Sequence, residues 1–161
     1  MDNTPDTIYQ DYQFLSGSQQ IRGGLIFGGK ISVMQKKVDV ILQKITSSNN
    51  FKEKYKFLVF QSSSTQVLHT KNKEIYIPSG LLVIAKNNDQ IAFILSHEIA
   101  HWENQDIRNN QVPIHRSPGQ ITEAECLADK KAIEISLLAQ YSRKEIDALL
   151  LSLKNERPVC E

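Results

Sequence analysis

Residues 74–102 read EIYIPSGLLVIAKNNDQIAFILSHEIAHW, which begins with the residue pattern of a strand and ends with that of a helix. The β-branched and aromatic residues of Glu74–Ile77 are typical of a strand. Pro78 cannot donate to a ladder, so it ends this strand or places it at an edge of the sheet. Asp89 is a suitable N-cap for a helix that runs to about Gln105, and apolar residues on nearly all its sides predict that the helix is buried.

The rest of the chain adds helices and short strands around this segment. An apolar stripe from Met34 to Ile45 predicts an amphipathic helix, and Phe57–Phe60 and Gln66–His69 are further strand candidates. These strands and Glu74–Ile77 should form a small antiparallel or mixed sheet of hairpin-connected strands. Capping signals predict two more helices, from Pro118 to about Gln140 and from Ser142 onward. The predicted fold class is α+β, with the sheet packed on the buried helix.

Length and charge exclude several classes of protein. The 161 residues suit one domain over 1–161, with an irregular N-terminal segment over 1–30 and a C-terminal helix and tail over 141–161. A net charge of +1 without a basic run gives no indication of a nucleic-acid partner. No apolar run approaches the ~20 residues that span a bilayer. With no secretory signal and only two cysteines, we expect a soluble protein, cytoplasmic in preference to exported.

The buried helix carries the pattern HExxH as His97-Glu98-Ile99-Ala100-His101. Residues four apart lie on one face of a helix, so His97 and His101 can bind the same Zn²⁺ ion. Glu98 would then lie beside a water at the open position of the metal and act as the general base. Two histidines and a glutamate are costly to bury in an apolar helix without a use. The motif therefore predicts one zinc per chain and a metallopeptidase.

A third protein ligand is required, and several downstream residues could provide it. The longer pattern HExxHxxGxxH does not apply, because Asn104 and Ile107 stand where it needs glycine and histidine. The remaining candidates are His115, Glu123, Glu125, Cys126, Asp129 and Glu134. Glu125 and Asp129 share one helix face, so Glu125 could bind zinc while Asp129 accepts a hydrogen bond from a ligating histidine. The alternative is a solvated acidic face that pairs with neighbouring lysines.

The segment Glu125-Cys126-Leu127-Ala128-Asp129 resembles the E-x-x-A-D signature of the M48 metallopeptidases. This family includes membrane-bound CAAX-processing proteases, HtpX heat-shock proteases and small soluble relatives. Residues 74–102 also look like its strand, Gly-Leu-Leu turn and metal helix. The resemblance implies a zincin-like fold and a gluzincin site, in which His97, His101 and Glu125 bind zinc. It further implies that Glu98 is the base and that Asp129 supports a ligand.

Two other residues and the substrate complete the predictions. His115, in the loop between the two ligand helices, could stabilise the transition state. Cys160, near the C-terminus, could fold back onto zinc. The substrate would be a peptide or unfolded protein, bound as an extended strand added to the edge of Glu74–Ile77. The competing hypothesis is a catalytically weak or inactive metal-stabilised domain that binds peptides or proteins through the same cleft.

Overall fold

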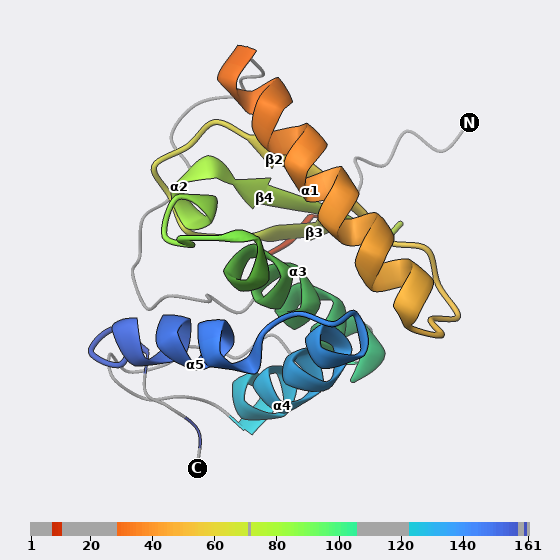
Figure 1. The fold of residues 1–161 in the computed structure, drawn as a ribbon. Helices are drawn as coiled ribbons and strands as arrows, with labels where there is room; N and C mark the ends of the chain where they lie inside the picture. The colour runs from red at the N-terminus through yellow and green to blue at the C-terminus, as the bar shows by residue number, and fades with distance from the viewer. Residues whose placement is uncertain (1–7, 11–28, 71, 106–122, 158–159, 161) are drawn as a thin grey trace.

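The computed structural model describes residues 8–10, 29–70, 72–105, 123–157 and 160. Helices and short strands are mixed along the chain, which confirms the predicted α+β class (Figure 1). In chain order the elements are β1 (Ile8–Gln10), α1 (Gly29–Ser48), β2 (Lys56–Phe60), β3 (Leu68–Thr70), β4 (Glu74–Pro78), α2 (Ser79–Leu82), α3 (Asn88–Glu103), α4 (Glu123–Leu138) and α5 (Arg143–Ser152). Among the described helices, none is both long and apolar enough to cross a membrane.

The four strands form one mixed sheet in the order β1-β3-β4-β2. β3 and β4 are antiparallel, as a hairpin requires, but β2 runs parallel to β4, so the prediction of hairpins throughout was wrong. Strand β1 pairs with β3, with Tyr9 opposite His69. We had predicted an irregular segment over 1–30, and this was wrong for Ile8–Gln10. A strand of three residues is too short to show a period.

Strand β4 lies inside the sheet, with β3 on one side and β2 on the other. Its backbone groups are therefore used by its neighbours, and the predicted pairing of a substrate with Glu74–Ile77 as an edge strand was wrong. Pro78 ends β4, as predicted. The outer edge of β2 is occupied by Gln35 of α1. Its side-chain amide donates to Phe57 O over 2.8 Å and accepts from Val59 N over 2.8 Å.

Polar side chains fix the starts of α3 and α5. Asn87 is the N-cap of α3 and accepts a hydrogen bond from Gln90 N, so the predicted cap, Asp89, was off by two residues. Asp89 instead accepts a hydrogen bond from Ser142 N over 2.7 Å. Ser142 caps α5 through Glu145 N, as predicted. This hydrogen bond between the two helix starts explains why Asp89 was mistaken for the cap. A local sequence pattern does not reveal a partner 53 positions away. The predicted start of α4 at Pro118 lies outside the described residues.

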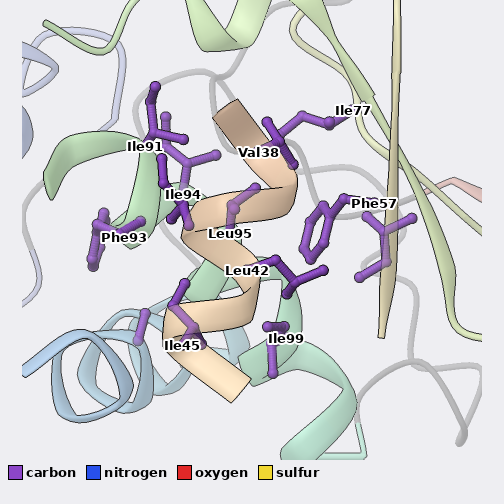
Figure 2. Packing of buried hydrophobic residues seen from close by; sticks show 14 of the residues in the cluster. Val38, Leu42, Ile45, Phe57, Ile77, Ile91, Phe93, Ile94, Leu95 and Ile99 are labelled. Atoms are coloured by element: carbon purple, nitrogen blue, oxygen red, sulfur yellow. The ribbon is translucent and has the colours of Figure 1, made fainter. Parts of the chain in front are cut away.

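Helix α3 occupies the centre of the molecule, with α1 on one side and α4 and α5 on the other (Figure 1). Its residues from Gln90 to Trp102 are all buried, which confirms the predicted burial. Figure 2 shows side chains of α1, β2, β4 and α3 packed together. The labelled ones are Val38, Leu42, Ile45, Phe57, Ile77, Ile91, Phe93, Ile94, Leu95 and Ile99. This apolar packing fixes α3, and therefore the HExxH side chains, in position.

Small residues let α4 approach α3 closely. Ala128 and Ala132 of α4 are fully buried, and the hydroxyl of Ser136 donates to that of Ser96 on α3 over 3.1 Å. Because these side chains are small, the two backbones come near enough there for short polar side chains to meet. The acidic residues on this face of α4 therefore reach the histidines of α3.

Candidate metal centre

Two histidines of α3 and one glutamate of α4 converge on a single buried point. His97 Nε2 lies 3.1 Å from His101 Nε2 and 3.1 Å from Glu125 Oε2. His101 Nε2 lies 3.4 Å from Glu125 Oε1. The three side chains are at most 1% exposed. One turn of α3 thus aligns the two imidazoles, and the close packing of α4 brings the carboxylate to them.

These three residues fit a metal ion in both geometry and chemistry. Their ligand atoms all lie within 4.8 Å of one another. Ligands at ~2.0–2.1 Å from a tetrahedral ion are separated by about 3.3–3.4 Å, close to the distances seen here. Two imidazoles and a carboxylate are also donors that zinc accepts, with one position left for water. Helix α3 supplies two of the donors, and α4 supplies the third.

Asp129, one turn after Glu125 on α4, supports His97. Its Oδ1 lies 2.9 Å from His97 Nδ1. The ionised carboxylate can only accept, so Nδ1 carries a hydrogen and Nε2 is the nitrogen that a bound metal would use. The alternative of a solvated acidic face does not hold for Glu125 and Asp129, because both are buried and both face His97.

Both carboxylates are held in the ionised state. Burial raises the pKa of Glu125, but attraction to His97 and hydrogen bonds from His101 and His97 outweigh burial, so its pKa lies well below the usual value. Burial likewise raises the pKa of Asp129. Hydrogen bonds from His97 and Arg157, together with their positive charges, outweigh that effect and lower the pKa. Ionised carboxylate oxygens beside the two imidazoles are suited to a cation.

Glu98 follows His97 on α3 and is held by a strand residue. Its Oε2 lies 2.9 Å from Nε2 of His69 on β3, and both side chains are fully buried. The indole of Trp102 donates to His69 Nδ1 over 2.8 Å. An indole N–H can only donate, so His69 carries its hydrogen on Nε2 and donates it to Glu98. Trp102, His69 and Glu98 thus form a directed chain of hydrogen bonds that ends on the carboxylate.

Comparison with known protein families agrees with this arrangement. The model of peptidase family M48 matches residues 32–122, which is more than half of the 161-residue chain. The chain belongs to peptidase family M48. The match includes the sheet from β2 onward and the whole of α3 and ends just before α4. A search of curated proteins found no match. M48 peptidases depend on a metal, so membership places the chain among the metallopeptidases.

Three further residues of this M48 protein were named in the site predictions: His115, Cys126 and Cys160. His115 lies outside the described residues, so its role stays a prediction. Cys126, one of the candidate third ligands, forms a disulfide with Cys160. Cys160 is therefore not a free thiolate that could bind zinc, although the tail does fold back toward α4. Disulfides persist mainly in oxidising compartments, so the cysteines no longer support a cytoplasmic location.

Sequence reasoning missed two residues next to the candidate metal centre, His69 and Arg157. His69 had no nameable partner, because Glu98 and Trp102 are 29 and 33 positions away. No periodicity indicates such a contact. Arg157 lies in a tail that looked unconstrained, yet it is 1% exposed and donates to Asp129. The presence of two cysteines was the available signal, since a bond between them would fix the tail near α4.

Proposed function

We propose that this M48 protein is a zinc-dependent endopeptidase that hydrolyses peptide bonds with Glu98 as general base. The convergence of two imidazole nitrogens and a carboxylate at one buried point, next to an oriented glutamate, carries the proposal. His97, His101 and Glu125 would hold one zinc per chain. The bound ion would supply a Lewis acid that lowers the pKa of water toward ~7 and polarises the substrate carbonyl.

Glu98 performs the proton transfers of the proposed reaction. Its carboxylate takes a proton from the attacking water, whose oxygen forms the new bond to the carbonyl carbon. The same carboxyl group then gives the proton to the amide nitrogen, and the C–N bond breaks to leave a carboxylate and an amine. His69 holds Glu98 by one oxygen, so that the carboxylate enters the reaction in a fixed orientation. A domain that only binds peptides would have no use for this buried, oriented carboxylate.

The substrate is proposed to be an extended peptide or an unfolded protein segment, since the reacting carbonyl must reach a point between two helices. Asp129 keeps His97 in the tautomer that presents Nε2 to the metal. His115, which follows α3 in the sequence, remains the proposed stabiliser of the transition state. The substrate must enter elsewhere than at β4, whose two edges are occupied.

The function is tested by metal analysis and peptide cleavage in parallel. Protein purified without added zinc should contain close to one zinc per chain and cleave a library of unstructured peptides. A chelator should remove both the metal and the activity, and added zinc should restore both. A metal content near zero with no uptake on reconstitution would falsify the proposal.

Acidification should release the metal because it protonates the histidine ligands, and not because it protonates the carboxylates. Protons compete with zinc for the imidazole nitrogens, so zinc affinity should fall steadily as the pH falls. Glu125 and Asp129 have lowered pKa values and stay ionised longer. Their contribution to the stability of the metal-free chain is present above the usual carboxyl pKa and is lost as pH falls through their lowered pKa values. Zinc release and acid unfolding, followed by metal-indicator absorbance and circular dichroism, should therefore occur at different pH.

Removal of His69 should lower the catalytic rate and have little effect on substrate binding. In His69→Phe the orientation of Glu98 is lost, so kcat should fall about 10- to 100-fold with little change in KM. His69→Gln can donate to Glu98 and accept from Trp102, so it should recover most of the activity. Zinc content and melting temperature measured on both variants separate orientation from stability. Equal activity in both variants and wild type would remove His69 from the mechanism.

A further inference from the structure

A buried arginine near the C-terminus contacts both carboxylates on the metal-facing side of α4. Arg157 is 1% exposed, and its two terminal nitrogens donate to both oxygens of Asp129 over 2.7 and 2.5 Å. Its Nη2 also lies 3.5 Å from Glu125 Oε2. One guanidinium therefore faces both the proposed third ligand and the residue that orients His97.

The arginine balances negative charges that would otherwise be buried together. Glu125 and Asp129 are one helical turn apart, and both are held in the ionised state within the protein. Burial lowers the pKa of Arg157, but hydrogen bonds and attraction to Asp129 and Glu125 outweigh it and raise the pKa. A planar guanidinium can bridge two acceptors in fixed directions, which an ammonium cannot do. Arg157 thereby fixes where the two carboxylates point.

Asp129 connects Arg157 to the proposed metal ligand His97. Asp129 Oδ1 accepts hydrogen bonds both from Arg157 Nη2 and from His97 Nδ1. A change in the position of Arg157 would shift Asp129, and His97 would lose the partner that selects its tautomer. Arg157 is thus a positioning residue, since it acts on the metal only through the side chains that bind or support it.

The chain is fixed on both sides of Arg157. It follows the end of α5, and its backbone N–H donates to Leu153 O over 2.7 Å. Three residues later, Cys160 is joined by a disulfide to Cys126, the immediate neighbour of Glu125 on α4. The tail is therefore bound on both sides of Arg157, by α5 before it and by the disulfide after it. Breaking the disulfide would remove the covalent attachment on the C-terminal side of Arg157.

We propose that the Cys126–Cys160 disulfide keeps Arg157 seated on Asp129 and Glu125, so that retention of zinc depends on the redox state of this cysteine pair. The proposal rests on the metal site proposed above. In a cell, a dithiol would supply the reduction. Its thiolate attacks one sulfur and breaks the S–S bond, and its second thiolate resolves the mixed disulfide. The products are two cysteine thiols and the oxidised dithiol, and the freed tail no longer holds Arg157.

The test compares zinc affinity in the oxidised and reduced full-length chain. A phosphine is the reductant of choice, because dithiols bind zinc; it becomes the phosphine oxide with oxygen from water and leaves two thiols. Titration with a competing chelator should show zinc bound about 10- to 100-fold more weakly after reduction. The double variant Cys126→Ser/Cys160→Ser should show the same loss without reductant, which excludes direct effects of new thiols on the metal.

Variants of Arg157 test whether the disulfide acts on the metal ligands through this residue. Arg157→Met should weaken zinc binding about 10- to 100-fold in both redox states, and Arg157→Lys should recover part of the loss because it restores the charge. Adding the two serine substitutions to Arg157→Met should cause little further loss, since the disulfide acts through Arg157. Arg143→Met, which removes an exposed arginine from α5, is the matched control and should bind zinc like wild type.

The outcomes separate this inference from the proposed function. Equal zinc affinity before and after reduction, or losses that simply add in the triple variant, would overturn the redox proposal while the zinc site stands. Two free thiols in a thiol titration of the untreated protein would also overturn it. An oxidised wild-type chain that takes up no zinc would overturn the proposed function instead. Faster amide exchange of residues 153–157 after reduction, measured without metal, supports the release of the tail independently of zinc.

Discussion

Glu98→Gln is expected to lower peptide hydrolysis by at least about 100- to 10,000-fold, the range contributed by a general base, and so to abolish it in ordinary assays. The amide has the shape of the carboxylate but cannot take the proton of water. It can still accept the hydrogen bond from His69, so the buried contact survives. Activity on an unstructured peptide, zinc content and melting temperature should be measured on the same preparation.

The informative result is the combination of lost activity with retained zinc and fold. Glu134→Gln is a suitable control, because it makes the same substitution at an exposed position of α4. Loss of activity together with loss of zinc would make Glu98 a structural residue. Full activity in Glu98→Gln would end the proposed mechanism, whatever the metal content.

The second large effect is expected from Glu125→Ala, which should weaken zinc binding by more than about 100-fold, beyond the usual loss for residues that only support a ligand. The substitution removes one of three donors. It also leaves His97, His101 and Arg157 without the carboxylate that each of them faces. Because the side chain is buried, water replaces it poorly. Chelator competition on the purified variant measures the affinity directly.

Three further variants rank the residues around the metal. Glu123→Ala is the matched control, since Glu123 is exposed two positions earlier on α4, and it should leave zinc affinity unchanged. Asp129→Asn should bind zinc about 10- to 100-fold more weakly, as expected for a residue that orients a ligand. His115→Ala should keep the metal and lose at most some rate. Zinc lost in His115→Ala but kept in Glu125→Ala would contradict the proposed ligand set.

Local patterns in the chain indicated the longer helices and the side chains that share one face of α3. Helix α3 could be predicted because its apolar residues and polar start signal lie within one continuous segment. The same helical spacing places His97 and His101 on one face, whatever surrounds them. Helical spacing likewise placed Glu125 and Asp129 on one face of α4, and both are buried in the structure. Each of these features depends on neighbours a few positions apart.

Features that depend on distant segments could not be read in this way. The parallel pairing of β2 with β4 and the strand β1 follow from how the chain crosses the sheet, which no short pattern encodes. His69 and Arg157 acquire their roles from partners about thirty positions away. Their sequence surroundings resemble an ordinary strand and an ordinary tail. Burial converts these contacts into strong ones, because a polar group removed from water must find its partner within the protein.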